Sequence, residues 1–348
     1  MASSSSSSSG IHIKFGPIDG DVLWLQPKHV SEHVWNGEPD RMLHIRRAVP
    51  IYRFIGGVLF VDKSSSKVSL RYLQFLRDFE QCSTYAWGPA VLAYLYREMC
   101  SATDYKIKSI GGMCILIQMW AWERCTTLAP KRTPPIMENK PLGHRWLRRG
   151  NQHIGNDDLI VFRRKLDIMK QHEFLWEPYT ATVMSMLPPI CLVGSMAWCA
   201  VVPLICFHVV EWHQPDRVLR QFGMQQPIPE SPSQPWNVHE LTLKGKMDEN
   251  WFQLLAPFIC QWNNRAEFRV DVYARQEGLL SFNSDYMVWY RRKTKMFINP
   301  NNANTATLVF LGFRVSGWGL GLVVYFYGYG YGLGLWVRVY ELRYKVMS

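Results

Sequence analysis

The sequence predicts a mainly α-helical fold, an irregular multi-helix globular domain with proline-rich connectors and few or no strands. Its 348 residues are 48% hydrophobic and 14% aromatic, enough to build the core of one large or two ordinary domains. Residues 70–124 contain two consecutive helical patterns with too much apolar surface to be stable alone. Prolines cluster in two connectors, residues 126–156 and 225–235, and keep these segments out of helices.

The chain is basic and contains scattered cysteines. Its formal net charge of +11 favours polyanionic partners such as nucleic acid or an acidic membrane surface, although charge alone gives no specificity. Its 8 cysteines include no Cys-x-x-Cys pair, which is typical of a reduced, intracellular protein whose thiols pack as small apolar side chains. Cys206, His208 and His213 lie close in sequence, but a second pair at zinc-finger spacing is missing. We therefore predict no metal site and no cofactor.

The chain begins with a serine run. This run has neither the basic nor the apolar region of a secretory signal, so we expect residues 1–15 to be a disordered tail. The folded domain is expected over residues 16–300, and a tail rich in glycine and aromatic residues over residues 301–348.

The two helical patterns after residue 70 should lie at the centre of the core. Gly88 and Pro89 suit the start of a helix over residues 89–100, because proline lacks an N–H that the first turn leaves unpaired anyway. Ser109 suits the start of a second helix over residues 109–124. Residues 110–122 carry no charge, and such a helix is normally buried on every side. We expect the side chains of Ile115, Leu116 and Trp120 to be almost wholly buried.

The middle of the chain predicts three further helices. Asn156 and the two aspartates after it favour a helix start. Residues 178–210 carry no charge, which suggests a membrane span, but Pro188, Pro189 and Pro203 interrupt the run. We predict an apolar loop followed by a buried helix from Pro203, and then a helix over residues 215–222 that Gly223 ends. Arg217 and Arg220 are expected to face outward.

The last part of the domain predicts two helices. Asp248 suits the start of the first, in which Trp251, Leu254, Leu255, Phe258 and Trp262 recur at helical spacing and should face the core. The second should begin at Ser284 and stop at Pro300.

Basic residues in the first connector and in the last helix are candidate nucleic-acid contacts. The last helix carries the densest basic cluster of the chain, and its charges cannot all lie on a buried face. The alternative is a solvated helix end, where cations are favoured by the helix dipole. The candidates are Arg145, Arg148, Arg149, Arg291, Arg292, Lys293 and Lys295.

The tail leaves two interpretations open. Residues 315–337 carry no charge and are long enough to cross a bilayer, and basic residues follow them. However, tyrosine alternates with other residues from Tyr325 to Tyr331 in a low-complexity pattern, with glycine at several of the intervening positions. The tail is therefore either poorly ordered or a membrane segment.

No catalytic motif is present. The sequence has no P-loop, no G-x-S-x-G and no H-E-x-x-H motif. A two-metal nuclease would need spaced carboxylates, and those present cannot be sorted into such a site by spacing. These carboxylates include Asp78, Glu98, Glu123, Asp167, Glu211 and Asp216. We predict that the protein is not an enzyme.

Several blocks of the sequence carry a family resemblance, and they occur in order between about Gly16 and Pro300. They are Gly16–Asp19, Lys28–Gly37, Tyr85–Cys100, Gln118–Arg124, Phe174–Tyr179, Pro203–Gly223 and Tyr286–Arg292. Together they resemble the plant mobile domain family, sometimes labelled aminotransferase-like. The chain departs from the family near residues 46–55, where a longer portion is missing through a true deletion or a gene-model error.

The resemblance implies a transposon-related domain, found in plant mobile elements and in host proteins similar to those that maintain meristems and silence transposable elements. We expect a non-catalytic nuclear protein with protein partners and nucleic-acid contacts. The alternatives are a remnant of an element-encoded protein that assisted transposition, and a membrane protein anchored through residues 315–337. The aminotransferase-like label would require a Schiff-base lysine and a phosphate-binding glycine loop for pyridoxal phosphate, and we find a candidate for neither.

Overall fold

The structure is a computed structural model of the whole chain. The predictions for residues 1–15, for the departure near residues 46–54 and for the helix end at Pro300 lie outside the described residues. The structure describes residues 55–61, 72, 75, 78–102, 104, 106–107, 109–129, 136, 138–146, 156–229, 238, 241–242, 249–270, 273–293, 322–329 and 332–339.

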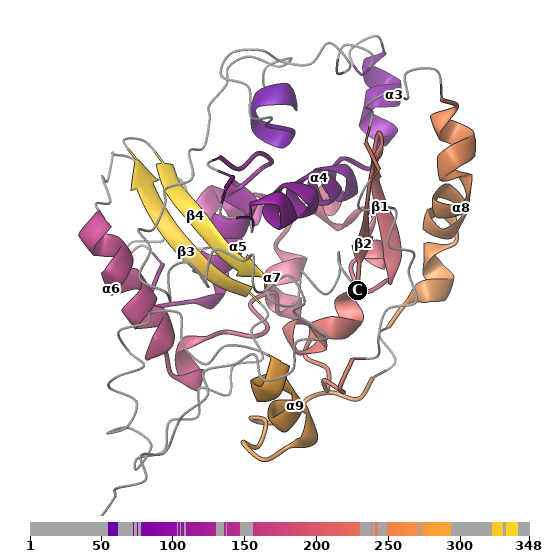
Figure 1. Cartoon of the computed structure of the whole chain (residues 1–348). Coiled ribbons are helices and arrows are strands. Elements are labelled where there is room, and N and C mark those ends of the chain that lie inside the picture. The colour runs from indigo at the N-terminus through magenta and orange to yellow at the C-terminus, as the bar shows by residue number, and fades with distance from the viewer. Residues whose placement is uncertain are drawn as a thin grey trace, which may run out of the picture.

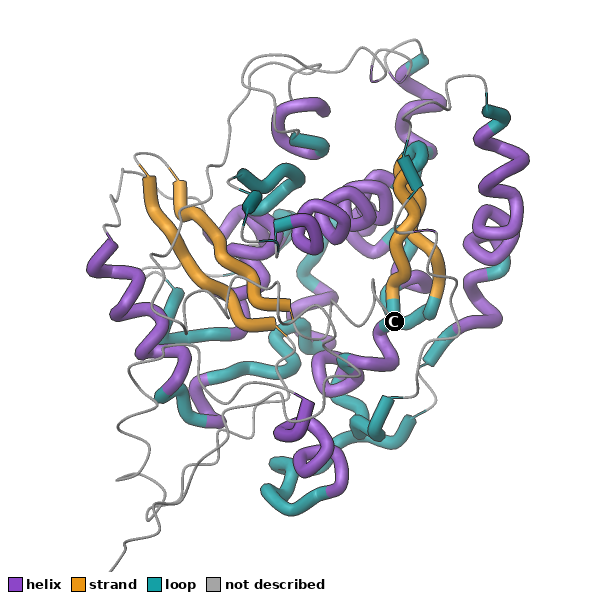
Figure 2. The backbone as a smooth tube through the Cα atoms, viewed as in Figure 1, coloured by secondary structure: helices purple, strands orange, loops and turns teal. Residues whose placement is uncertain are grey.

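Helices make up most of the regular structure, as the sequence predicts (Figures 1 and 2). The α-helices are α3 (Phe79–Thr84), α4 (Trp87–Ser101), α5 (Ile115–Arg124), α6 (Asn156–Asp167), α7 (Ala181–Ser185), α8 (Trp251–Asn263) and α9 (Asp285–Lys293). The strands are β1 (Val202–Cys206), β2 (Val209–His213), β3 (Leu322–Tyr329) and β4 (Gly332–Val339). Shorter helical turns are η2 (Ile55–Leu59), η4 (Leu142–Trp146), η5 (Gln171–Glu173), η6 (Pro189–Leu192), η7 (Ser195–Ala197), η8 (Pro215–Arg217), η9 (Leu219–Phe222) and η11 (Arg265–Phe268).

Helix α4 confirms a helix over residues 89–100, but it begins at Trp87 after Ala86 and not after Gly88 as predicted. Helix α5 begins later than predicted. The expected start at Ser109 is wrong because Gly112 has a left-handed backbone, with φ of 81°, which ends any helix that reaches it. The Gly112 N–H donates to the carbonyl of Val61 at 2.7 Å, and the Gly111 N–H donates to Glu98 Oε2 at 2.8 Å. These bonds hold the turn between α4 and α5.

The predicted burial of α5 is wrong for the three side chains named. Ile115 is 40% exposed, and Leu116 and Trp120 are only partly buried. The buried side chains of this helix include Gln118, Glu123 and Arg124. The absence of charge in residues 110–122 therefore does not make every side of α5 buried, and the core side of this helix includes the polar and charged side chains of Gln118, Glu123 and Arg124.

The predicted helix after Pro203 is wrong, since residues 202–213 form a two-stranded antiparallel hairpin. Val202 pairs with His213 and Cys206 with Val209, and Phe207 turns the chain with φ of 54°. The hairpin is buried on both faces because α4 covers one face and α8 the other (Figure 1). A short apolar strand buried on both faces lacks the alternation that distinguishes a strand from a helix in sequence.

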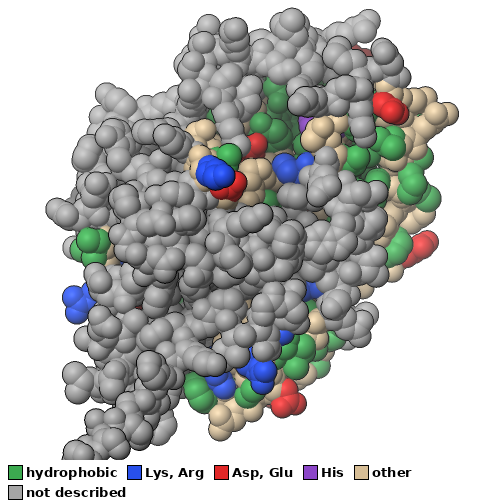
Figure 3. Space-filling model, viewed as in Figure 1, with side chains coloured by type: hydrophobic (Ala, Val, Ile, Leu, Met, Phe, Trp, Pro, Cys, Tyr) green, Lys and Arg blue, Asp and Glu red, His purple; other side chains and the backbone are tan. Residues whose placement is uncertain are grey.

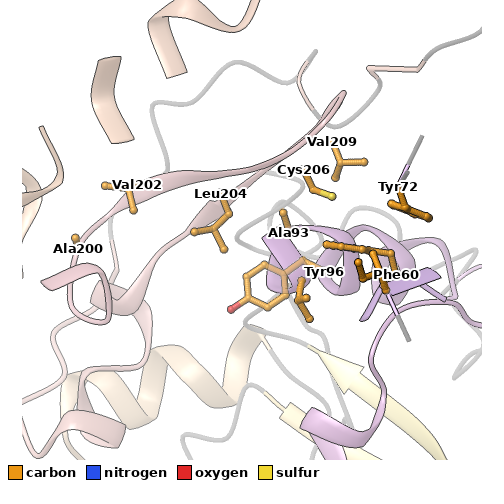
Figure 4. Packing of buried hydrophobic residues seen from close by; sticks show 11 residues of the cluster. Phe60, Tyr72, Ala93, Tyr96, Ala200, Val202, Leu204, Cys206 and Val209 are labelled. Atoms are coloured by element: carbon orange, nitrogen blue, oxygen red, sulfur yellow. The ribbon is translucent and has the colours of Figure 1, made fainter. Parts of the chain in front are cut away.

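The main core lies where α4 meets β1. Figure 4 shows Ala93 and Tyr96 of α4 beside Leu204 and Cys206, with Phe60 and Tyr72 at one end. The rings of Phe60 and Tyr72 are stacked with centroids 5.4 Å apart. This cluster joins residues far apart in sequence, and it fixes α4 and the hairpin as one unit.

The segment after the hairpin is more irregular than predicted. The expected helix over residues 215–222 is divided into η8 and η9, because Val218 between them has a non-helical backbone. Gly223 ends η9 with φ of 76°, as predicted. Arg217 and Arg220 were expected to face outward, but their side chains are buried.

Helices α6, α8 and α9 occur where the sequence predicts helices. Asn250 caps α8 by accepting a hydrogen bond from the Gln253 N–H at 3.2 Å, whereas Asp248 lies outside the described residues. Leu255 of α8 is buried, but Leu254 was expected in the core and is 39% exposed. Ser284 begins α9 through a bond from the Met287 N–H to its hydroxyl.

Part of the tail forms a second antiparallel hairpin. Leu322 of β3 pairs with Val339 of β4, and Tyr329 pairs with Gly332. Strand β3 lies beside α6, and β4 lies beside α5 (Figure 1). The domain boundary near residue 300 and the two interpretations of the tail stay predictions.

Candidate functional site

A cluster of arginine and aromatic side chains brings together three separate segments of the chain. Helix α5 contributes two of its members at positions i and i+4, which lie on one face of a helix. The segment after η5 contributes three, and η9 contributes one. We call the set the arginine–aromatic cluster: Trp120, Arg124, Phe174, Trp176, Tyr179 and Arg220.

Arg124 is the buried centre of one half of this cluster. Its guanidinium carbon lies 5.0 Å from the ring centroid of Trp120 and 5.3 Å from that of Tyr179. Its carbonyl accepts a hydrogen bond from the Leu175 N–H at 2.8 Å. Tyr179 is 41% exposed, so one ring of the cluster reaches the surface. Arg124 thus links α5 to the segment 174–179 through both its backbone and its side chain.

Arg220 is the centre of the other half. Its guanidinium carbon lies 3.7 Å from the Trp176 ring centroid, a close cation–π contact. Phe174 lies between the halves, with ring centroids 4.7 Å from Trp176 and 6.3 Å from Trp120. The indole N–H of Trp120 donates to Gln221 Oε1 at 3.1 Å, which ties α5 to η9.

Burial sets the electrostatics of the cluster. The loss of hydration lowers the pKa of Arg124, while Tyr179, Cys125 and Glu123 act in the opposite direction. An arginine remains charged at neutral pH despite such a shift. Two positive charges are therefore held on aromatic faces. The arrangement suits rigid joining of segments and recognition at the exposed Tyr179 edge, and it holds no nucleophile.

An ion pair next to the cluster fixes a second junction. Arg275 Nη2 lies 2.7 Å from Glu177 Oε2 and 3.2 Å from Glu177 Oε1. The backbones of residues 223–225 and 274–276 also bond to each other, with the Gln276 N–H donating to the Gly223 carbonyl at 2.8 Å. This junction holds the segment before α9 against the end of η9.

A partly buried arginine on α4 joins that helix to the hairpin. Arg97 pairs with Glu211, which is only 2% exposed. Arg97 Nη2 also donates to the carbonyls of Val210 at 3.2 Å and Val238 at 3.0 Å. Glu211 belongs to the face of the hairpin that meets α4, so its charge is compensated inside the core.

Of the basic residues predicted to contact nucleic acid, Arg145 forms its contacts inside the fold. Its Nη2 lies 2.8 Å from Glu123 Oε2, and its guanidinium lies over the ring of Trp146. The Trp146 indole N–H donates to Glu123 Oε1. Burial raises the pKa of Glu123, and its bonds to Trp146 and Arg145 oppose that shift. Arg148 and Arg149 lie outside the described residues.

Some basic side chains at the end of α9 also make contacts inside the fold. Arg291 Nη1 donates to the Phe282 carbonyl at 2.6 Å, and its guanidinium lies 3.8 Å from the Phe282 ring centroid. Lys293 is only 8% exposed, whereas Arg292 is exposed. Lys295 lies outside the described residues. Arg292 is thus the exposed member among the described candidates, and nucleic-acid contact by this set stays a prediction.

Four of the six carboxylates considered for catalysis take part in separate structural bonds. Asp78 caps α3, Glu98 accepts from the Gly111 backbone, and Glu123 and Glu211 each pair with a different arginine. Among the described residues, no group of three or more His, Cys, Asp or Glu is placed to hold a metal ion. Burial raises the pKa of the Cys114 and Cys125 thiols to about 12. Thiols with such pKa values are poor nucleophiles.

The arginine–aromatic cluster was missed from sequence, although one signal was present. Trp120 and Arg124 are four residues apart, and Arg124 is the first cation after a long uncharged run. Such a pair predicts stacking on one helix face. Nothing in the sequence joins this pair to Trp176 or Arg220, because these residues meet only in the folded chain.

Comparison with known sequences places these junctions within one family. The sequence model of the plant mobile domain matches residues 32–291, which include every member of the cluster and all three ion pairs described above. The chain belongs to the plant mobile domain family. Within this plant mobile domain, α4, α5 and the β1–β2 hairpin form the centre, and β3 and β4 lie outside the matched residues.

Three relatives from Arabidopsis thaliana illustrate the similarity. The chain is 37% identical to Serine/threonine-protein phosphatase 7 long form homolog over 72% of this chain and 20% of that protein. It is 34% identical to Protein MAINTENANCE OF MERISTEMS over 76% of this chain and 54% of that protein. It is 30% identical to Protein MAIN-LIKE 1 over 71% of this chain and 45% of that protein.

These relatives are longer than the region they share with this chain. The chain spans between 20% and 54% of their lengths. No solved structure matches the chain. The region that these relatives share with this chain corresponds to the plant mobile domain. The remaining parts of the relatives do not align with this chain.

Proposed function

We propose that this plant mobile domain protein is a non-catalytic nuclear protein that acts in meristem maintenance and in the silencing of transposable elements. The observation that carries the proposal is its similarity to Protein MAINTENANCE OF MERISTEMS, 34% over 76% of this chain. The name of that relative refers to meristems. The role in silencing and the nuclear location rest on the family resemblance.

The geometry supports a binding role in place of a catalytic one. The buried carboxylates join segments through arginines, as Glu211 does with Arg97 and Glu123 with Arg145. Tyr179 presents the arginine–aromatic cluster at the surface. Aromatic rings and arginines are enriched where proteins bind other proteins, so this edge is a candidate contact for a protein partner.

Complementation in plants tests the proposal. The full chain, fused to a fluorescent protein, would be expressed in Arabidopsis plants that lack Protein MAINTENANCE OF MERISTEMS. We expect nuclear fluorescence, restored meristem organisation and lower transcript levels of transposable elements. A fusion that accumulates in nuclei and restores neither meristems nor silencing would contradict the proposal.

A matched pair of variants separates a specific effect from expression level. Arg124→Ala removes the buried guanidinium of the arginine–aromatic cluster and should abolish complementation. Val193→Ser alters a side chain that is 73% exposed and should leave complementation unchanged. Both proteins are compared at equal abundance.

Two further roles remain as alternatives. A remnant of an element-encoded transposition protein would bind the ends of its element, so selection of bound DNA would recover one sequence. A tail-anchored protein would resist carbonate extraction until residues 301–348 are removed. Among the helices that the structure describes, none is long and apolar enough to span a bilayer.

A further inference from the structure

The buried guanidinium of Arg124 has hydrogen-bonding capacity that the described part of the fold does not use. The side chain is only 4% exposed, and its neighbour Glu123 pairs with Arg145. Among the described residues, no acceptor lies within hydrogen-bond distance of the buried Nε and Nη1 atoms of Arg124. Buried donors without an acceptor are uncommon, because they lose their hydration and gain nothing in return. Arg124 can therefore donate hydrogen bonds to a further group.

Two aromatic rings flank this guanidinium, and one of them lies at the surface. Trp120 is held by its bond to Gln221, whereas Tyr179 is 41% exposed and lies between η5 and α7. A hydrogen bond between Tyr179 and Arg124 favours the charged guanidinium and opposes the fall in its pKa. Partly exposed side chains change rotamer readily, so Tyr179 can turn outward and uncover the guanidinium.

The charge of the site selects an anion. Arg124 stays positively charged at neutral pH, and the two rings carry no net charge that could compensate it. An anion that replaces the Tyr179 hydroxyl would accept hydrogen bonds from the guanidinium in surroundings with little water. Charge-assisted hydrogen bonds are strongest in such surroundings. A cationic ligand would meet repulsion at the same place.

The size of the charge favours a carboxylate over a phosphate. A carboxylate carries one negative charge, which matches one guanidinium, whereas a phosphate group carries about −1.5 to −2 at neutral pH. Glu177 lies two residues before Tyr179 in sequence, and Arg275 already compensates its charge. The additional charge of a phosphate would have no partner among these groups, and a buried charge without a partner is costly.

The surroundings of Arg124 suit a segment of protein. Leu175, whose N–H bonds to the Arg124 carbonyl, is 48% exposed, so the segment that contacts Arg124 exposes two apolar side chains, Leu175 and Tyr179. A nucleic-acid backbone would require a row of cations. Figure 3 shows the Lys and Arg side chains of the described residues in small separate groups on the face in view. An acidic side chain with apolar neighbours fits this surface.

We propose that Arg124 binds a glutamate or aspartate side chain of a protein partner, which enters when Tyr179 turns outward. The inference rests on the binding role proposed above, and it names the chemistry that the arginine–aromatic cluster recognises. The carboxylate takes the place of the Tyr179 hydroxyl at the guanidinium. Apolar side chains next to the carboxylate pack on Leu175 and on the ring of Tyr179.

Titration of the purified full chain with the capped tripeptide acetyl-Leu-Glu-Leu-amide tests the proposal. The uncharged counterpart is acetyl-Leu-Gln-Leu-amide, and nuclear magnetic resonance of arginine Nε–H and tryptophan indole groups reports the contact. We expect the signals of Arg124 and Trp120 to shift with the glutamate peptide, with half-saturation at about 1 mM, and not to shift with the glutamine peptide. Inorganic phosphate should require a higher concentration.

Three variants test which groups carry the binding. Arg124→Lys keeps the charge but lacks the planar fork, so the half-saturation concentration, followed at the Trp120 indole, should rise at least about tenfold. Arg164→Lys is the matched control, because Arg164 is exposed on α6, and it should bind as the wild type does. Tyr179→Phe removes the competing hydroxyl and keeps the ring, so the half-saturation concentration should fall about threefold.

The peptide pair and Tyr179→Phe decide the question even where Arg124→Lys does not fold. Equal shifts with both peptides, no shift with the glutamate peptide, or tighter binding of phosphate would overturn the proposal. Wild-type binding by both Arg124→Lys and Tyr179→Phe would overturn it as well. A chain that binds the glutamate peptide and fails to complement in plants would contradict the proposed function and support this inference.

Discussion

The carboxylate of Glu177 occupies the space next to the α-carbon of Gly223. A Cβ atom at Gly223 would lie 1.8 Å from Glu177 Oε1, far inside any contact distance. Gly223 also has a φ of 76°, a conformation that other residues rarely adopt. The end of η9 therefore approaches Glu177 closely because residue 223 has no side chain, and this approach lets Glu177 pair with Arg275.

Gly223→Ala should destabilise the protein strongly. The left-handed backbone costs about 1–2 kcal/mol for alanine, and displacement of Glu177 adds about 1–3 kcal/mol. Gly194→Ala is the control, because Gly194 has a φ of 80° but nothing within 4 Å of the added atom. Chemical denaturation of both variants measures the difference. Equal losses of stability would show that Glu177 moves aside without cost.

Trp120→Phe should lower the free energy of unfolding by about 1 kcal/mol, because it removes the hydrogen bond to Gln221 and keeps an aromatic ring. Trp120→Ala should lower it by about 2–4 kcal/mol, less than the loss for a fully buried tryptophan, since Trp120 is only partly buried.

A double-mutant cycle isolates this hydrogen bond. Trp120→Phe and Gln221→Ala are measured alone and together by denaturant unfolding, and the coupling should be about 0.5–1.5 kcal/mol. Additive losses would mean that the two side chains act independently in solution.

Glu123 should make stability fall as pH rises. Burial raises its pKa above the ordinary value of 4.5 in the folded state, so the folded protein binds this proton more tightly than the unfolded chain. The unfolding free energy therefore decreases as pH rises above 4.5 through the raised pKa. Glu123→Gln removes this dependence. Relative to the variant, the wild type should lose stability over that window, and parallel pH profiles would contradict the assignment.

Nucleic-acid binding, if it uses α9, should depend on Arg292 more than on its neighbours. Arg292→Ala should flatten the log–log dependence of duplex affinity on salt by about one unit. Arg145→Ala should leave that slope unchanged and lower stability, because Arg145 pairs with Glu123. Fluorescence anisotropy at several salt concentrations measures both. If the wild type does not bind the duplex at low salt, the basic residues at the end of α9 are ordinary surface charges.

The class of fold, the family and most helix positions could be predicted from the amino-acid sequence. Local signals sufficed for these: Gly88 and Pro89 lie in the first turn of α4, Ser284 begins α9 and Gly223 ends η9. Each depends on the backbone preference or hydrogen bonding of one or two residues. The resemblance to plant mobile domains rests on side chains in order along the chain, and it was confirmed over residues 32–291.

The strands and the positions of the buried charges became apparent only in the folded chain. Residues 202–213 form a hairpin whose two faces are covered by α4 and α8. Their sequence does not indicate which elements cover them, so it cannot distinguish a buried strand from a buried helix. Arg217 and Arg220 have charged side chains, yet both are buried. The guanidinium of Arg220 stacks on the ring of Trp176. The cost of burying a charge depends on partners distant in sequence, so the folded chain alone reveals whether that cost is met.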